Sequence, residues 1–320
     1  MTIPRDEFAW IRAWTAGCPT QSAAVAVPIG DDAAVTRNDY GQDTVSCIDT
    51  MTEGVHFDPT QMTMREIGWK CVAINLSDLA AMGAELIGVQ VAVVVPPQVT
   101  AESVAELYRG IDDVLREYRG VLLGGDTVRG CHDFTVTVAA LGSVPSGTAV
   151  TRAGARPGDR LLLTGPTGYS GSVWRAWARG VTVPERYRAA HTRPQPRLRD
   201  GQVLRELGAT AMNDISDGLA ADLYEIADTS QAGIVLDASA FDWLPDLAEG
   251  AACCRVSAEE LALYGGEDYE LAVTLPAALT VPKGARVIGR VTDGQGVYWE
   301  SAEGAALLPR KGFNHFQEDL

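Results

Sequence analysis

One stretch of the sequence decides the fold: EIGWKCVAINLSDLAAMG, residues 66–83. It predicts a helix, and Gly83 stands where a glycine commonly follows the last helical residue. Asn75 and Asp78 lie three residues apart, so they share one face of this helix. The segment is largely apolar, and we therefore expect the Asp78 carboxylate to face the interior or a cleft, where it needs hydrogen-bond donors or a metal. A solvent-exposed aspartate near a helix end is the alternative.

Strands and helices are predicted to alternate on both sides of this helix. The first half of the chain has strand patterns at residues 45–49, 86–95, 121–123 and 134–141, and a helix pattern at 100–118. The second half has helix patterns near 169–179, 199–207 and 219–227, and strand patterns near 161–163, 234–236, 269–275, 285–288 and 297–299. Glycines and prolines gather at residues 143–160, which indicates a domain boundary. We therefore expect an α+β fold of two α/β domains, residues 1–145 and 146–320.

The charge of the chain restricts its partners. The 320 residues are 46% hydrophobic and 21% charged, with a formal net charge of −16, which is typical of a globular protein and not of a disordered one. Nucleic acid and anionic membrane surfaces attract clustered lysine and arginine, so neither is expected as a partner. An acidic protein that handles phosphates needs divalent cations to bridge its carboxylates to the phosphate oxygens.

The sequence also bears on the location of the protein. It contains no run of 18 apolar residues, and its first residues lack the basic and then apolar pattern of a signal peptide. The six cysteines are scattered without a Cys-x-x-Cys pair, which indicates neither a zinc site nor a disulfide framework. We expect a cytoplasmic protein.

Acidic residues recur in short motifs. Besides the segment around Asp78, these motifs are Gly30-Asp31-Asp32, Cys47-Ile48-Asp49, Gly124-Gly125-Asp126-Thr127, Asp214-Ile215-Ser216-Asp217-Gly218 and Gly265-Gly266-Glu267-Asp268. Each motif is expected where a strand ends or a helix begins, with Ser216 as the cap of the following helix and Asp217 in its first turn. Any one of them could be an ordinary turn or cap. Together they predict two or more Mg²⁺ ions bound with phosphates, because Mg²⁺ prefers hard oxygen ligands.

Familiar phosphate-binding motifs are absent. The sequence has no Gly-x-x-x-x-Gly-Lys-Ser/Thr loop and no protein-kinase His-Arg-Asp or Asp-Phe-Gly set. Metals and arginines must then neutralise the phosphates of ATP, and the candidate arginines are Arg129, Arg152 and Arg156. The glycine-rich turn at residues 164–171, between a predicted strand and a predicted helix, is a weaker candidate phosphate site.

In this order the motifs resemble those of the thiamine-monophosphate kinases. That family belongs to the superfamily of aminoimidazole ribonucleotide synthetase, selenophosphate synthetase and a hydrogenase-maturation protein. The resemblance covers nearly the whole chain. It implies ATP-dependent phosphorylation of thiamine monophosphate to thiamine diphosphate by direct in-line transfer, with several Mg²⁺ ions and a monovalent cation as a further candidate. It also implies a homodimer whose interface is the N-terminal mixed sheet, and a C-terminal sheet that is covered by helices and completes the nucleotide and substrate site.

The same resemblance implies roles for individual residues. No residue is implied as a covalent catalytic nucleophile. The magnesium ligands would be Asp32, Asp49, Asp78, Asp126, Asp214 and Asp217. The nucleotide would contact Gly125, Asp126, Arg152 and Ser216. The substrate would contact His56, Glu267 and Phe313, the last by stacking on a thiamine ring.

Two departures from the family pattern leave alternatives open. Ile48 stands where the family usually has a hydroxyl residue before the metal-binding aspartate, and Phe313 stands where it usually has Tyr or Trp. A kinase for a different small molecule, a cyclo-ligase of the same superfamily, and a nucleotide- or metal-binding module without turnover are therefore alternatives. Cys18 has no lysine near it in the sequence, which disfavours a selenophosphate synthetase.

Overall fold

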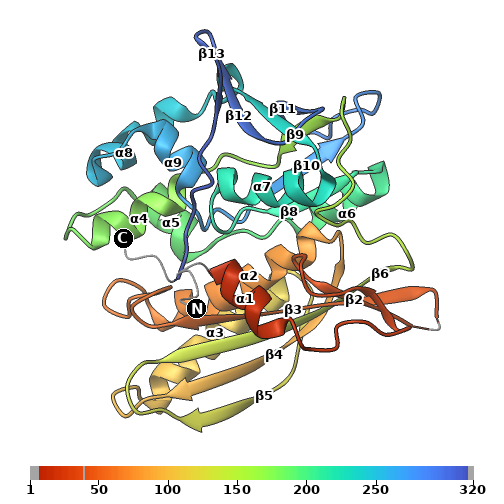
Figure 1. Ribbon diagram of the computed structural model, residues 1–320. Helices are drawn as coiled ribbons and strands as arrows, with labels where there is room; N and C mark the ends of the chain where they lie inside the picture. The colour runs from red at the N-terminus through yellow and green to blue at the C-terminus, as the bar shows by residue number, and fades with distance from the viewer. Residues whose placement is uncertain (1–6, 39, 316–320) are drawn as a thin grey trace.

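Helix α2 (Met64–Ala81) is the predicted central helix, and it lies between two β-sheets (Figure 1). The computed structural model describes residues 7–38 and 40–315. A capping box begins α2: the Thr63 hydroxyl accepts from the Glu66 N–H, and the Glu66 carboxylate accepts from the Thr63 N–H. Gly83 follows the helix end with φ of +67°, a left-handed conformation that favours glycine. The predicted helix and its end are thus confirmed.

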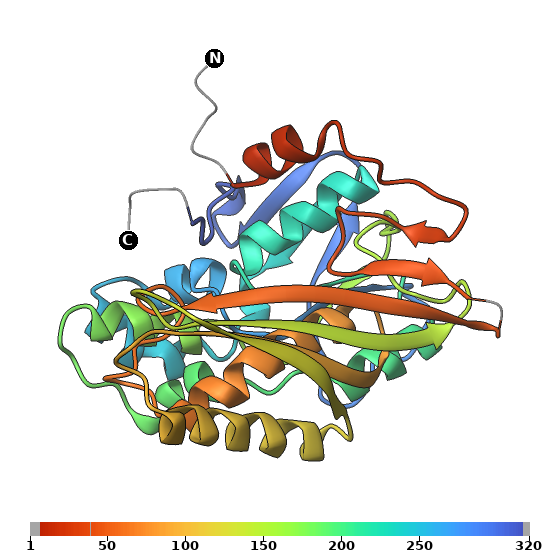
Figure 2. The same cartoon turned by 90° about the horizontal axis from the view of Figure 1, so that it is seen from below.

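Six strands form the first sheet, in the order β1-β2-β3-β6-β4-β5. They are β1 (Val25–Val27), β2 (Ala34–Arg37), β3 (Gln42–Thr52), β4 (Glu85–Val95), β5 (Val121–Arg129) and β6 (Thr135–Pro145). Neighbouring strands are antiparallel except β4 and β5, which are parallel. Helices α2 and α3 (Ala101–Glu117) cover one face of this sheet (Figure 2). Alternate residues of β6, such as Val136 and Val138, are therefore buried.

Seven strands form the second sheet, in the order β13-β12-β9-β11-β7-β10-β8. They are β7 (Arg160–Leu163), β8 (Ala211–Asp214), β9 (Gly233–Asp237), β10 (Leu271–Leu275), β11 (Arg286–Thr292), β12 (Gly296–Ser301) and β13 (Gly304–Leu307). The helices of this half are α4 (Tyr169–Trp177), α5 (Glu185–Thr192), α6 (Leu198–Leu207), α7 (Leu219–Ser230), α8 (Ala248–Cys254) and α9 (Ala258–Tyr264). The pair β9–β12 is parallel and the other pairs are antiparallel. Both sheets are mixed and both halves contain helices, which confirms the predicted α+β class.

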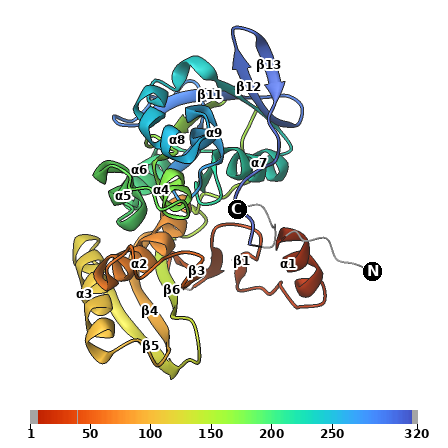
Figure 3. The same cartoon turned by 90° about the vertical axis from the view of Figure 1, so that its left-hand side faces the viewer.

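Helix α2 also packs against the half of the molecule that contains the second sheet. It contacts α5, α6 and β8, and Figure 3 shows it between α3 and the helices of that half. The hydrophobic core around α2 includes Leu162, Met212 and Leu271 from the second sheet. This double packing explains why α2 is buried on nearly all sides, whereas a surface helix buries one stripe. Polar residues on α2 therefore lie at the junction between the two sheets.

The prediction that β5 ends at Gly124-Gly125 is wrong. The strand continues through Asp126 to Arg129. A side chain at Gly125 would come within 1.9 Å of the Val91 carbonyl oxygen. This glycine therefore permits two strands to pair closely and does not make a turn.

The predicted cap of α7 is also wrong. Helix α7 begins at Leu219 after Gly218, and no side chain caps it, so Ser216 and Asp217 precede the helix. Asp49 lies inside β3 and not at the end of a strand. Several short elements, α1 (Glu7–Thr15), α5, α8, α9, β1, β2, β8 and β13, have no predicted counterpart, because a few residues carry too little periodicity to be recognised.

Within residues 7–38 and 40–315, no helix combines the length and apolar character that crossing a bilayer requires. The first six residues, which carry part of the pattern used to predict location, lie outside the described residues.

Candidate active site

Three aspartates from distant parts of the sequence meet at the junction between the sheets. Asp32 lies in the loop before β2, Asp78 in the last turn of α2 and Asp214 at the end of β8. Each offers a carboxylate oxygen, and these oxygens all lie within 4.8 Å of one another. The Ser77 hydroxyl helps to fix this arrangement by donating to Asp214 Oδ2 at 2.6 Å. We refer to Asp32, Asp78 and Asp214 as the carboxylate cluster.

The crowding of acidic groups shows in their pKa values. Burial, reinforced by repulsion from Asp32, raises the pKa of Asp214 to about 8 and that of nearby Asp49 to about 6. Burial and three neighbouring aspartates raise the pKa of Asp78 well above its usual range. One buried oxygen of the cluster, Asp32 Oδ2, has no hydrogen-bond partner among the described residues. Excess negative charge, hard oxygen donors and an unpartnered buried oxygen all fit a divalent cation such as Mg²⁺.

Arg152 balances part of this negative charge. Its guanidinium is ion-paired with Asp32 and donates from Nε to Asn213 Oδ1 at 3.0 Å. Its backbone N–H donates to Asp31 Oδ2 at 3.1 Å. Burial raises the pKa of Asp32, and the Arg152 charge opposes that rise. The structure therefore places Arg152 against the cluster, where it supports an ionised Asp32.

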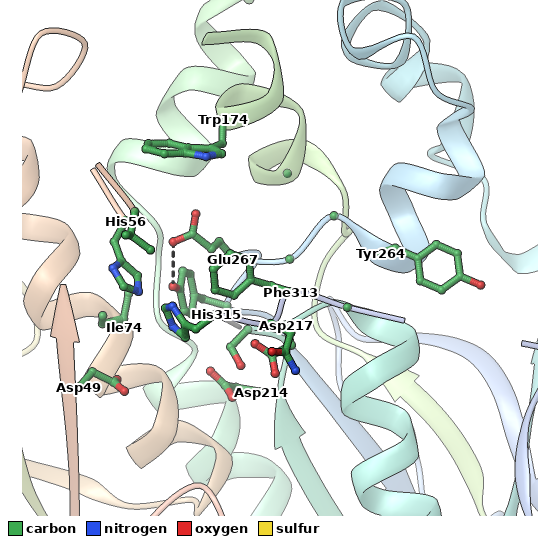
Figure 4. A pocket seen from close by; sticks show the side chains of 18 of the residues that line it. Asp49, His56, Ile74, Trp174, Asp214, Asp217, Tyr264, Glu267, Phe313 and His315 are labelled. Carbon is green, nitrogen blue, oxygen red and sulfur yellow. Dashed lines mark hydrogen bonds between the residues drawn. The ribbon is translucent and has the colours of Figure 1, made fainter. Parts of the chain in front are cut away.

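A pocket of about 440 Å³ opens beside the carboxylate cluster (Figure 4). Its acidic end is formed by Asp49, Asp78, Asp214 and Asp217, so four of the six predicted metal ligands line the same space. Ile48 lines the pocket too, and its side chain offers no oxygen. This end of the pocket suits phosphate groups bound through metal ions.

The other part of the pocket has ring side chains. His56, Glu267 and Phe313, the three predicted substrate contacts, all line the pocket. Ser216 lines the pocket as well and lies in sequence between Asp214 and Asp217 of the acidic end. Figure 4 shows Trp174 at the far end from Asp49 and Asp214, with Glu267 and His56 between. Aromatic walls with a few polar groups are typical of sites that bind planar organic molecules.

Two buried residues behind Glu267 were not predicted as site residues. Lys70 on α2 and His191 on α5 are fully buried, and they contact the Glu267 carboxylate at 2.8 Å and 3.3 Å. For Lys70 the sequence held a signal, because a lysine within an apolar helix needs a buried partner just as Asp78 does. His191 lies in a short helix that the sequence pattern did not predict, and no local signal pointed to it.

Gly125 and Asp126 are not brought to this pocket. They lie on β5, the outer strand of the first sheet (Figure 1), where all nine residues are exposed. Among the described residues, neither one lines the pocket and Asp126 is not part of the carboxylate cluster. The described part of this chain therefore does not bring these two predicted ligands to the carboxylate cluster or the pocket.

Two family models match consecutive parts of the chain. Residues 30–144 match "AIR synthase related protein, N-terminal domain", and residues 156–300 match "AIR synthase related protein, C-terminal domain". Each range contains most of one of the two sheets.

Individual relatives identify a narrower family than these two domain models do. The thiamine-monophosphate kinase of Bacillus subtilis (strain 168) is 33% identical, over 98% of this chain and 100% of that protein. The solved structure of AaThiL complexed with AMPPCP and TMP is 26% identical, with a TM-score of 0.86 and 97% of both chains covered. The structure of thiamine-monophosphate kinase from Stenotrophomonas maltophilia K279a is 33% identical, with a TM-score of 0.72, and the match covers 91% of this chain and 94% of that one. The chain belongs to the thiamine-monophosphate kinase family.

Proposed function

We propose that this chain transfers the γ-phosphoryl group of ATP to the phosphate of thiamine monophosphate, giving thiamine diphosphate and ADP. The observation that carries the proposal is that the carboxylate cluster adjoins a pocket with ring side chains. One end of this site suits phosphates and the other suits an aromatic acceptor. Membership of the thiamine-monophosphate kinase family, and a similar structure that holds AMPPCP and TMP, support the same pair of substrates.

Magnesium is the cation that we assign to the acidic end of the site. Asp32, Asp49, Asp78, Asp214 and Asp217 would hold it, because they supply hard oxygen ligands and negative charge. When bound, Mg²⁺ would neutralise phosphate oxygens of both substrates. Because Ile48 supplies no oxygen from its side chain, this position could contribute only its backbone carbonyl to a metal.

The side chains of the site would act by alignment. The acceptor is a phosphate oxygen that is anionic at neutral pH, so no protein nucleophile or general base is needed. Glu267, His56 and Phe313 would hold the organic part of the acceptor, with the Phe313 ring against a thiamine ring. Arg152 would keep Asp32 ionised, and Ser216 would contact the nucleotide.

A second copy of the chain would complete the nucleotide site. Strand β5 exposes apolar side chains, among them Val121, Leu122 and Val128, and an edge strand of this kind is normally covered. A homodimer formed through the first sheet would cover them and place Gly125 and Asp126 at the nucleotide. We also propose that the two domains comprise residues 1–145 and 146–320, and that the protein is cytoplasmic.

An acceptor screen tests the proposed reaction. The purified protein is incubated with labelled ATP, Mg²⁺ and either thiamine monophosphate, thiamine, a formylglycinamidine ribonucleotide or no acceptor, each with and without K⁺. We expect label in thiamine diphosphate only, and no product after EDTA treatment. Label in a product of thiamine, or ADP formation without an acceptor, would contradict the proposal. Turnover only with a formylglycinamidine ribonucleotide would identify a cyclo-ligase instead.

A further inference from the structure

A buried ammonium group lies behind the wall of the pocket. The side chain of Lys70 has no exposed surface, and an ammonium group in such a place is strongly unfavourable unless its donors are satisfied. Its three N–H donors have three acceptors nearby. These are Glu267 Oε1 at 2.8 Å, the His56 carbonyl oxygen at 3.0 Å and His191 Nε2 at 3.4 Å.

The same contacts fix the protonation of His191. A lysine ammonium can only donate, so His191 Nε2 must accept and the ring proton must be on Nδ1. Nδ1 lies 3.0 Å from Ser170 Oγ and 3.3 Å from Glu267 Oε2. Burial, together with the charge of Lys70, lowers the pKa of His191 to about 3, which agrees with a neutral ring. The Nδ1–H group therefore hydrogen-bonds to the Ser170 hydroxyl and lies within 3.3 Å of the second oxygen of Glu267.

Glu267 is thus ion-paired through one carboxylate oxygen and contacted by His191 at the other, while it still faces the pocket. Its side chain is 28% exposed, and Figure 4 shows it between His56 and Tyr264. Its backbone has φ of +55°, which is uncommon for a residue other than glycine, and its N–H donates to the Ser216 carbonyl at 2.7 Å. Backbone strain of this kind is typically kept where the position of a side chain matters to function.

The contacts of Lys70 join the two halves of the molecule. Lys70 and His56 come from the half with the first sheet, whereas His191 and Glu267 come from the half with the second. One ammonium group therefore fixes a pocket-lining segment from each half: the carbonyl of His56 and the carboxylate of Glu267. Lys70 itself is not among the described residues that line the pocket.

We propose that Lys70 and His191 are positioning residues, which hold Glu267 and the His56 segment in the arrangement that binds the organic part of thiamine monophosphate. This inference rests on the proposed function. A fixed carboxylate beside ring side chains suits a cationic ring or a ring amine, and thiamine carries both. The metal-binding end of the site is formed by other residues, so the effect of Lys70 and His191 is confined to the acceptor.

Separate measurements of KM for thiamine monophosphate and for ATP test this role of Lys70. Lys70→Met removes the charge at similar length, and we expect it to raise KM for thiamine monophosphate about tenfold or more, because a charged hydrogen bond to Glu267 is lost. KM for ATP is expected to stay within about twofold of the wild-type value, since Glu267 is not among the residues that we assign to the nucleotide. Lys70→Arg keeps the charge and is expected to restore part of the acceptor affinity.

A matched pair of variants tests His191. In His191→Asn the amide nitrogen occupies the place of Nδ1, so the donor that faces Ser170 and Glu267 is kept. In His191→Gln the amide occupies the place of Nε2, so that donor is lost. We expect a raised KM for thiamine monophosphate in His191→Gln and a near wild-type KM in His191→Asn.

A double-mutant cycle and a control separate positioning from folding. If Lys70 acts through Glu267, the double variant Lys70→Met with Glu267→Gln is no worse than the worse single variant. Arg188→Met removes another ion pair between the two halves, at 2.6 Å from Glu66 and away from the pocket lining. This control is expected to lower the Tm and leave both KM values unchanged.

The outcomes are decisive for both proposals. A folded Lys70→Met variant with unchanged KM for thiamine monophosphate, or with an equal rise in KM for ATP, overturns the positioning role. If Lys70→Met does not fold, the histidine pair decides, and equal KM values for His191→Asn and His191→Gln overturn it. A wild-type protein that does not phosphorylate thiamine monophosphate overturns the proposed function and this inference together. An active wild type with unaffected variants overturns this inference alone.

Discussion

Asp78 is the member of the carboxylate cluster that α2 contributes. Burial raises the pKa of its carboxyl group well above the usual range, and repulsion from Asp49, Asp214 and Asp32 adds to the rise. We predict that Asp78→Asn lowers kcat at least about 100-fold, the scale of losing one preorganised electrostatic contact. Without Mg²⁺ the variant should be as stable as the wild type or more so, because the substitution removes repulsion. Mg²⁺ should no longer raise its Tm, since ligand stabilisation requires binding to the native state. Steady-state kinetics and thermal melts with and without Mg²⁺ measure these effects.

Asp43 provides the control for a buried carboxylate outside the site. It accepts hydrogen bonds from the Ser146 hydroxyl at 2.9 Å and the Gly147 N–H at 2.8 Å. Asp43→Asn is expected to lower the Tm while turnover and the Mg²⁺-dependent Tm shift persist. Near-normal phosphorylation by Asp78→Asn would remove Asp78 from the ligand set.

At the scale of elements, the sequence predicted the helices and strands that form long segments with a clear hydrophobic pattern. Helix α2 was predictable because its length, its apolar character and Gly83 agree with one another. The end of β5 was not predictable, because Gly124-Gly125 is typical of a turn. Only the pairing with strand β4 explains why glycine is needed there. The aspartates proposed as metal ligands were recognisable from their sequence motifs. The contact of His191 with Glu267 was not, because it arises from tertiary packing between segments far apart in sequence.

Strand β5 is the element through which the proposed dimer forms. Leu122 is 48% exposed on this strand, so Leu122→Asp should leave the fold intact. The substitution places a charge in the proposed interface, and we predict monomers by light scattering together with a loss of kcat, because Asp126 would no longer reach a nucleotide. Asp126→Asn should lower kcat without changing the oligomeric state.

Strand β13 offers a matched control for this experiment. Leu307 lies at the edge of the second sheet and is 61% exposed. Leu307→Asp is expected to change neither oligomeric state nor kcat. A Leu122→Asp protein that keeps the wild-type mass in solution would rule out β5 as the interface.

At the scale of the whole molecule, the buried acids make stability depend on pH and metal. The pKa of Asp31 is raised to about 7 and that of Asp214 to about 8, mainly by burial, from an unfolded value of 3.8. The native state therefore binds more protons than the unfolded state, so this stabilisation is present at low pH and is lost as the pH rises through 7 and 8. Burial lowers the pKa of His56 to about 4 and that of His191 to about 3. These two histidines destabilise the native state as the pH falls, but only below their unfolded pKa of 6.5.

We therefore predict that the metal-free protein loses stability as the pH rises from 6.5 to 8. The slope is at most about 1.4 kcal/mol per pH unit for each titrating group. Mg²⁺ should flatten or reverse this slope, because it binds the ionised carboxylates that metal-free burial disfavours. Thermal melts across this range, in EDTA and in excess Mg²⁺, measure both effects, and Asp214→Asn should show a shallower slope in EDTA. Equal slopes in EDTA and in Mg²⁺ would mean that the raised pKa values are unrelated to metal binding, and the buried aspartates would then need an explanation within the fold alone.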